Sequence, residues 1–236
     1  MPRLGVLGWP VAHSRSPAMH NAALQALGMD VIGWRYQLLP VAPERFAETV
    51  RALASAGFVG ANVTIPHKHA ALDVSPRDMS ALVLGAGGSA RAVVWALREA
   101  GAHEVAVWNR TPERACALAR DLGVRAVSRP APADLLVNCT SVGLEPGGES
   151  LKQSATEPQG LNLLELTFDQ VGTYSHVVDL VYRSSPTPLL AAAHARGART
   201  VDGLEILLAQ GALSFELWTG VQPPLEVMRH ALRDLR

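Results

Sequence analysis

A glycine-rich stretch directly after an apolar run most constrains what this chain can fold into. Residues 81–84 predict a buried strand, and residues 90–97 predict the helix that follows it. Between them Gly85, Gly87 and Ala90 match the G-x-G-x-x-G/A pattern of a dinucleotide-binding turn. The pattern supplies a tight bend, a close backbone approach to pyrophosphate and close helix–strand packing. Glycine-rich turns also arise for packing alone, so the strand–turn–helix context is what favours nucleotide binding.

The stretch before this turn alternates strand and helix patterns. Ser16 is expected as a helix N-cap with Pro17 at the first helical position, and Gly28 as the glycine that ends the same helix. The order predicts an α/β layer with mostly parallel strands. The expected strands are residues 4–7, 34–39 and 60–65, and the expected helices are residues 16–27, 43–57 and 67–72.

The stretch after the turn predicts a second α/β unit, of Rossmann type. Residues 143–176 are polar and glycine-rich and give no ordered prediction. We expect two domains, residues 1–78 with 219–236 and residues 79–218, with a helix over residues 203–218 that leads back to the first domain. The further expected strands are residues 103–108, 124–127, 135–138, 177–181 and 200–201, and the further expected helices are residues 112–123, 188–195 and 224–235.

Composition excludes several classes of function. Twenty-one acidic and 21 basic residues give zero net charge, so no basic field exists to hold nucleic acid or anionic lipid. No apolar run has the length of a membrane span, and no signal-peptide pattern opens the chain. Cys116 and Cys139 lack metal-site spacing, and the eight histidines form no ligand set. We expect a cytoplasmic protein without a metal site.

The end of the second Rossmann strand indicates which dinucleotide binds. An acidic residue at this point binds the ribose 2′-hydroxyl in NAD-binding units, and it would repel a 2′-phosphate. Here the strand is followed by Asn109, Arg110 and Thr111, with Arg114 one helical turn later. Arginine binds phosphate by paired hydrogen bonds, so this segment predicts NADP. The alternative is two solvated surface arginines.

For each of the other candidate residues, a purely structural role is an alternative to a functional one. Residues 138–143 end a strand, where small polar side chains would lie beside a dinucleotide or simply form a turn. Lys68 follows a strand and a proline, and it is either a functional or a solvated lysine. Ser14 and Ser16 suit a turn and a cap. Gln210, on an apolar helix face, is either a structural bridge or a ligand contact, because its amide has up to four hydrogen-bonding positions to satisfy.

Taken together, the motifs resemble the shikimate dehydrogenase family, NADP-dependent oxidoreductases of aromatic amino-acid and chorismate biosynthesis. The resemblance implies an N-terminal substrate-binding and catalytic domain, a Rossmann-like NADP-binding domain and an active site in the cleft between them. The matching pieces occur in the family's order over nearly the whole chain: GWPVAHSRSP at 8–17, NVTIPHK at 62–68, GAGGSAR at 85–91, NRT at 109–111, NCTS at 138–141, DLVY at 179–182, Gly203 and QGA at 210–212.

The resemblance also assigns roles to residues. It implies that Lys68 is the catalytic lysine, which exchanges a proton with the substrate oxygen while hydride passes to or from NADP. Shikimate or 3-dehydroshikimate is the implied substrate, and the protein would be a monomer or a homodimer. The implied substrate contacts are Ser14, Ser16, Asn62, Thr64, Tyr182 and Gln210. The implied cofactor contacts are Gly85, Ala86, Gly87, Gly88, Ser89, Ala90, Asn109, Arg110, Thr111, Arg114, Thr140, Ser141, Val142, Leu180 and Gly203.

One interval departs from the family pattern. Only 16 residues separate Lys68 from Gly85. The family carries two segments there, G-A-x-N-T with a substrate-binding Asn and N-T-D with an Asp that pairs with the lysine, and neither is present. Either the sequence joins residues across an absent stretch or the chain has a true deletion. The alternatives to an active shikimate dehydrogenase are therefore a non-catalytic or impaired binding paralogue, and a quinate/shikimate dehydrogenase.

Overall fold

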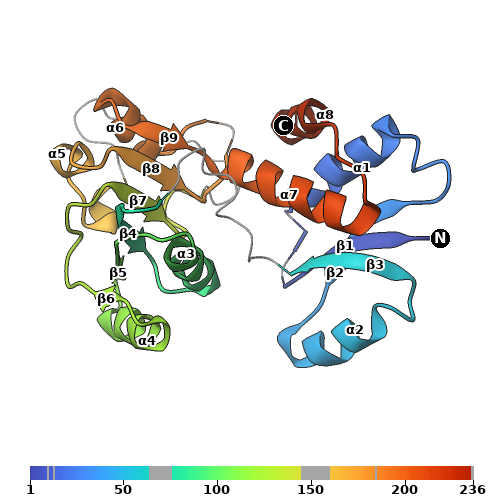
Figure 1. The fold of residues 1–236 in the computed structure, drawn as a ribbon, viewed down its shortest axis with the longest axis horizontal. Helices are drawn as coiled ribbons and strands as arrows, with labels where there is room; N and C mark the ends of the chain where they lie inside the picture. The colour runs from blue at the N-terminus through green and yellow to red at the C-terminus, as the bar shows by residue number, and fades with distance from the viewer. Residues whose placement is uncertain (10, 13, 64–75, 145–159, 184, 235–236) are drawn as a thin grey trace. The chain divides into compact units, whose positions relative to one another are not determined.

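The protein consists of two compact units, which Figure 1 draws as a ribbon. Unit 1 contains Met1–Pro66 and Leu207–Arg236, and unit 2 contains His67–Ile206. The expected domain bounds stay a prediction; the compact units place most of the helix over residues 203–218 with unit 1. The computed structural model describes residues 1–9, 11–12, 14–63, 76–144, 160–183 and 185–234.

Unit 1 contains a three-stranded parallel sheet in the order β2-β1-β3. The expected strands over residues 4–7 and 34–39 are present, and the third strand begins two residues before its expected start. Residues 64 and 65 of that expected strand lie outside the described residues. The expected helix over residues 67–72 lies outside the described residues. The elements are β1 (Arg3–Gly8), α1 (Ser16–Ala26), β2 (Arg35–Pro40), α2 (Phe46–Ala52) after a 3-10 turn at Pro43–Arg45, β3 (Phe58–Val63), most of α7 (Gly203–Thr219) and α8 (Leu225–Arg233).

The start of α1 corrects one expectation. Arg15, not Ser16, is the N-cap residue, and no side chain caps the helix. Ser16 is the first helical residue, and its side chain is buried beside Tyr36. The expected cap is therefore wrong, because Ser16 lies inside the helix rather than at the position that precedes it. Arg15 instead ties α1 to α8, donating from Nη1 to the Leu232 carbonyl oxygen at 3.0 Å.

Unit 2 is a six-stranded parallel sheet in the order β6-β5-β4-β7-β8-β9. This is the doubly wound order 3-2-1-4-5-6, in which ligands bind where the order reverses, between β4 and β7. Its elements are β4 (Ser80–Leu84), α3 (Gly88–Glu99), β5 (Glu104–Trp108), α4 (Pro112–Leu122), β6 (Arg125–Ala126), β7 (Leu135–Asn138), α5 (Phe168–Val171), β8 (His176–Asp179), α6 (Pro188–Ala195) and β9 (Arg199–Val201).

Both faces of this sheet are covered, so its strands are apolar throughout. Ala81 and Val83 of β4 point to a core shared with α3 and α4, while Leu82 and Leu84 point to a core shared with α5 and α6. The helices lie on the two faces accordingly (Figure 1). The alternation of sides along one strand explains why residues 81–84 are a continuous apolar run.

Three strands of unit 2 are shorter than the sequence predicts, and for β5 the difference is one residue at its start. β8 ends at Asp179 rather than at residue 181, because the Asp179 carboxylate accepts the Val181 N–H at 3.0 Å and turns the chain. β6 has two residues instead of the expected four. The expected helix over residues 43–57 is likewise broken into the 3-10 turn and the seven-residue α2.

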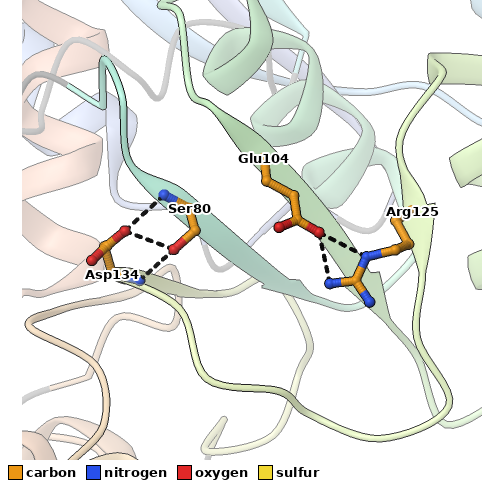
Figure 2. Close-up of polar contacts among 4 residues, drawn as sticks. All are labelled: Ser80, Glu104, Arg125 and Asp134. Carbon is orange, nitrogen blue, oxygen red and sulfur yellow. Dashed lines mark hydrogen bonds and ion pairs between the residues drawn. The ribbon is translucent and has the colours of Figure 1, made fainter.

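Polar contacts join the strands of unit 2 at their amino ends (Figure 2). Asp134, just before β7, accepts from the Ser80 backbone N–H at 2.9 Å and from its hydroxyl at 2.6 Å. These bonds hold the pKa of the Asp134 carboxyl below its usual value. Arg125 pairs with Glu104 across β6 and β5 at 2.7 Å. The polar contacts at the amino ends of the strands are structural. The glycine turn lies at the carboxyl ends of the strands.

Candidate active site

The turn after β4 has the geometry that its sequence predicts. Gly85 has φ +108°, which L side chains rarely adopt, and its N–H donates to the Trp108 carbonyl oxygen at 2.8 Å. A Cβ added at Gly85 would lie 3.2 Å from the carbonyl carbon of Cys139. The turn therefore lies against the chain that leaves β7, at the point where the strand order reverses. Ala90, which the pattern requires to be small, is completely buried.

The N-terminus of α3 offers an open anion site. Gly87 is the N-cap residue, and no side chain caps the helix. Its neighbours Gly88 and Ser89 are the first helical residues, so their N–H groups have no acceptor within the helix. A Cβ added at Gly87 would meet no atom within 4 Å. This space, together with the free N–H groups and the helix dipole, fits the pyrophosphate of a dinucleotide.

The segment after β5 presents two exposed arginines. Asn109 closes the turn by donating from Nδ2 to the Thr111 carbonyl oxygen at 2.9 Å, and Thr111 is the N-cap residue of α4. Arg110 and Arg114 are exposed. Other arginines of this unit form ion pairs among the described residues: Arg91 with Asp121, Arg125 with Glu104, and Arg196 with Asp169. The arrangement leaves Arg110 and Arg114 available for a 2′-phosphate.

The loop after β7 is organised by a buried asparagine. Asn138 Oδ1 accepts from the Thr140 backbone N–H at 3.0 Å and from its hydroxyl at 2.8 Å. The Thr140 hydroxyl oxygen in turn accepts from the Val142 N–H at 3.1 Å. These bonds fix the backbone over three predicted cofactor contacts, Thr140, Ser141 and Val142. Ser141 is exposed.

Asp179 is a fully buried carboxylate at the end of β8. It accepts from Asn138 Nδ2 at 2.9 Å, from the Val181 N–H at 3.0 Å and from the Thr187 hydroxyl at 2.6 Å. Burial raises the pKa of Asp179 to about 6, against these hydrogen bonds and the charge of Arg183, which lower it. The carboxylate thereby joins the loops after β7 and β8 to the start of α6.

Two further predicted cofactor residues are in contact. A Cβ added at Gly203, the first residue of α7, would lie 2.6 Å from the Leu180 carbonyl oxygen. Gly203 is therefore required for close packing against the segment after β8. The contact brings Leu180 and Gly203 together within unit 2. Close packing is therefore one reason for a glycine at position 203, and the predicted cofactor contact is another.

On the substrate side, unit 1 brings three predicted residues close together. Ser14 Oγ accepts from the Ser16 backbone N–H at 3.4 Å. The Ser16 side chain lies beside Tyr36, and the Tyr36 hydroxyl donates to Asn62 Oδ1 at 2.6 Å. One tyrosine of β2 thus links the start of α1 to the end of β3. Asn62 Nδ2 also donates to Ser214 Oγ of α7 at 2.9 Å.

The surroundings of Tyr36 are apolar and tightly stacked. The His20 ring lies parallel to the Tyr36 ring, with 4.1 Å between centroids, and Phe215 and Trp218 lie at 6.1 and 5.9 Å from His20. Burial raises the pKa of Tyr36 and lowers the pKa of His20 to about 3. Both groups are therefore neutral, and neither ring nitrogen of His20 has a hydrogen-bond partner among the described residues.

The remaining predicted residues are placed less completely. Lys68 and Thr64 lie outside the described residues, as does the interval from residue 64 to residue 75 that departs from the family pattern. Tyr182 is half-buried and follows β8 in unit 2. Gln210 is half-buried on α7 in unit 1, and its backbone carbonyl accepts from the Ser214 hydroxyl at 2.8 Å.

Sequence reasoning missed the residues that support these contacts. Tyr36 and Ser214 hold Asn62, while Asn138 and Asp179 hold the loop after β7. Asn138 and Asp179 belong to the motifs quoted above, and their position directly at strand ends was the available signal. No local pattern distinguishes Tyr36 or Ser214, because their partners are far away in the sequence.

Three family models match this chain. The model described as "Shikimate dehydrogenase substrate binding domain" matches residues 6–86, "Shikimate / quinate 5-dehydrogenase" matches residues 69–138, and "Shikimate 5'-dehydrogenase C-terminal domain" matches residues 203–233. The shikimate dehydrogenase (NADP(+)) of Acidiphilium cryptum is 40% identical over 271 residues, which covers 94% of this chain and 92% of the relative. The chain belongs to the shikimate dehydrogenase family. The NADP(+)-dependent enzyme of Methanopyrus kandleri is 37% identical over 289 residues, with 98% and 94% covered.

Solved structures of the family also match this chain over nearly its whole length. Shikimate dehydrogenase from Thermus thermophilus in complex with NADP(H) and shikimate has a TM-score of 0.76 and 38% identity, with 99% of each chain covered. Shikimate dehydrogenase from Aquifex aeolicus has a TM-score of 0.78 and 28% identity, with 99% of this chain and 98% of that chain covered. The predicted family, the α/β fold with a Rossmann-like part and NADP as the cofactor of an oxidoreductase family are confirmed.

The alignments also show that relatives carry extra residues. The alignment to the Methanopyrus kandleri enzyme extends over 289 residues, while this chain has 236, so at least 53 positions of the alignment have no residue here. Within the described residues no helix is long and apolar enough to cross a bilayer, and no three His, Cys, Asp or Glu side chains are grouped to hold a metal ion.

Proposed function

We propose that this chain catalyses the NADP-dependent reduction of 3-dehydroshikimate to shikimate, with the substrate bound mainly by residues of unit 1 and the cofactor by unit 2. The observation that carries the proposal is 38% identity over 99% of the chain to a relative whose structure holds NADP(H) and shikimate. The open N-terminus of α3 and the residues that surround Asn62 support it from this chain's own geometry.

Each part of the chain has a defined task in this reaction. NADPH, when bound, supplies the hydride for the substrate carbonyl carbon. The N–H groups at Gly87–Ser89 bind the pyrophosphate, and Arg110 and Arg114 bind the 2′-phosphate. Lys68 donates the proton that the carbonyl oxygen requires, and its positive charge stabilises the negative charge that develops there. The hydroxyl and carboxylate groups of the substrate are bound by Ser14, Ser16, Asn62, Thr64, Tyr182 and Gln210.

A second function, that of a cofactor-binding protein with little or no turnover, is favoured by one observation. The alignment to the Methanopyrus kandleri relative has at least 53 positions that this chain lacks, and the family's Asn and Asp segments between Lys68 and Gly85 are absent. Without the Asp partner of the lysine, proton transfer would be slow while the Rossmann part still binds NADP.

One set of assays separates these functions. NADPH absorbance is followed with 3-dehydroshikimate, then with NADH in its place, and then with shikimate or quinate and NADP in the oxidising direction. We expect NADPH oxidation that depends on 3-dehydroshikimate. NADP binding by calorimetry without turnover would favour the second function. Faster oxidation of quinate than of shikimate would make the chain a quinate/shikimate dehydrogenase.

A further inference from the structure

A directional chain of hydrogen bonds crosses the candidate substrate-binding residues of unit 1. The Ser214 hydroxyl donates to the Gln210 carbonyl oxygen, one helical turn earlier in α7, at 2.8 Å. The only Ser214 proton is thereby used, so Ser214 Oγ accepts from its other partner, Asn62 Nδ2, at 2.9 Å. A carbonyl oxygen can only accept a hydrogen bond. The Gln210 backbone carbonyl therefore fixes which group donates and which accepts in every hydrogen bond of this series.

This direction fixes the orientation of the Asn62 amide. Because Nδ2 faces Ser214, Oδ1 faces Tyr36 and accepts its hydroxyl proton at 2.6 Å. The opposite flip of the amide would set an oxygen against Ser214 and the two Nδ2 protons against the Tyr36 hydroxyl. Ser214 would then have to give up its bond to Gln210 in order to donate to the amide oxygen.

Contacts other than the bond to Asn62 fix the position of Tyr36. Its backbone carbonyl accepts from Asn21 Nδ2 and its backbone N–H donates to Asn21 Oδ1, both at 2.9 Å. β2 is an edge strand of the described sheet, and Asn21 takes the place that a neighbouring strand would fill. The ring is 3% exposed and stacks on His20. The tyrosine is a rigid point of attachment.

We propose that Tyr36 and Ser214 are positioning residues that hold the Asn62 amide with one N–H donor directed to a substrate oxygen. The inference rests on the proposed function, which makes Asn62 a substrate contact. An amide has two N–H donors and two acceptor lone pairs. Ser214 uses one donor and Tyr36 uses one lone pair, so one donor remains in a fixed direction. A preset donor binds more tightly than one that must first be oriented.

A double-mutant cycle on Tyr36→Phe and Asn62→Ala tests the proposal. We expect Tyr36→Phe to raise the KM for shikimate roughly two- to tenfold, as the loss of one neutral hydrogen bond does, and to leave the dissociation constant of NADP unchanged. In the Asn62→Ala background the same substitution should raise KM clearly less than in the parent protein, because the part of its effect that passes through Asn62 is already lost. Where turnover is too slow to measure, the shikimate dissociation constant from calorimetry replaces KM.

Two further variants keep the test decisive. Tyr174→Phe is the matched control, since Tyr174 is also 3% exposed and makes one hydrogen bond, to the Ala131 carbonyl oxygen at 3.1 Å. It should leave the shikimate KM unchanged. Ser214→Ala removes the partner on the other side of the Asn62 amide and should raise KM as Tyr36→Phe does. It provides the test on its own if Tyr36→Phe fails to fold.

The outcomes separate the two proposals. If Asn62→Ala raises KM while Tyr36→Phe and Ser214→Ala do not, the positioning role is wrong and the proposed function stands. Additive effects of Tyr36→Phe and Asn62→Ala would also overturn the positioning role. If the parent protein neither binds nor oxidises shikimate, the proposed function fails and the inference fails with it.

Discussion

Asn138 and Asp179 are opposite each other in the register of β7 and β8, and the Asn138 amide donates to the Asp179 carboxylate at 2.9 Å. The carboxylate has two more donors, the Val181 N–H and the Thr187 hydroxyl. Each of the two loops that follow these strands includes a predicted cofactor contact, Thr140 in one and Leu180 in the other. The contact therefore couples the stability of unit 2 to the shape of the predicted NADP site.

We expect Asp179→Ala to lower the free energy of unfolding by about 3 kcal/mol, because it leaves buried donors of Asn138, Val181 and Thr187 without their acceptor. Urea unfolding followed by circular dichroism measures the loss. Asp169→Ala is the control, since its side chain is 89% exposed and its ion pair with Arg196 is on the surface. Equal losses in the two variants would show that the buried network contributes nothing of its own.

Gly87→Ala should separate binding from stability. Its Cβ meets no protein atom within 4 Å, so the melting temperature should stay unchanged, while the Cβ enters the space predicted for the pyrophosphate and weakens NADP binding by about 1–3 kcal/mol. Gly123→Ala should do the reverse, because Gly123 has φ +63° at the end of α4 and lies outside the predicted site. NADP affinity that is unaffected in Gly87→Ala would place the cofactor elsewhere.

Cofactor choice depends on the arginines after β5. Losing both Arg110 and Arg114 should remove most of the preference for NADP over NAD, since each charge-assisted contact contributes about 1.5–3 kcal/mol. Dissociation constants for both dinucleotides at one ionic strength measure the effect. Arg120→Ala, an exposed change near the other end of α4, should leave the preference intact. Equal affinity of the parent protein for NADP and NAD would contradict the assignment.

The elements that the sequence predicts well are those with local physical causes. α6 has the expected bounds because a Thr–Pro start, an apolar body and a following glycine all lie within residues 187–197. The glycine turn after β4 is predictable for the same reason. The end of β8 is not, because the bond from the Val181 N–H to the Asp179 carboxylate decides it.

The same division applies to the candidate site. Asn109 and Thr140 act on neighbours two residues away, and the family motifs contain them. The bond between Asn62 and Ser214 joins residues 152 positions apart, and the bond between Tyr36 and Asn62 joins two different strands. No periodicity or spacing in the sequence encodes such a pair, so Tyr36 and Ser214 are found only once the chain is folded.

Lys68 gives the most direct test of the proposed chemistry. Lys68→Ala should lower kcat by about 10²- to 10⁴-fold, the usual contribution of general acid–base catalysis, and leave the NADP dissociation constant unchanged. Lys68→Arg should also lose turnover, because arginine keeps the charge but does not release its proton at ordinary pH. An unchanged kcat with a raised KM in Lys68→Ala would make Lys68 a binding residue only.

The pH dependence of stability contains two opposite contributions. The pKa of His20 falls from 6.5 to about 3 on folding, so the unfolded chain binds the extra proton and stability decreases as the pH falls from 6.5 toward 3. The pKa of Asp179 rises from 3.8 to about 6, so the folded protein binds the extra proton and stability increases as the pH falls through 6. Between pH 6 and pH 3.8 the destabilising contribution of His20 and the stabilising contribution of Asp179 therefore offset each other.

His20→Phe should reveal the hidden contribution, because phenylalanine keeps a ring beside Tyr36 and Phe215 but binds no proton. Relative to the parent protein, its free energy of unfolding should rise as the pH is lowered from 7 to 5, by up to about 1.4 kcal/mol per pH unit below 6.5. The Asp179 contribution is common to both proteins and cancels in this difference. His230→Gln, which replaces a histidine whose side chain is 81% exposed, is the comparison variant for the loss of an exposed histidine. A difference between His20→Phe and the parent that is the same at pH 7 and pH 5 would mean that His20 is protonated in the folded protein or does not titrate on unfolding.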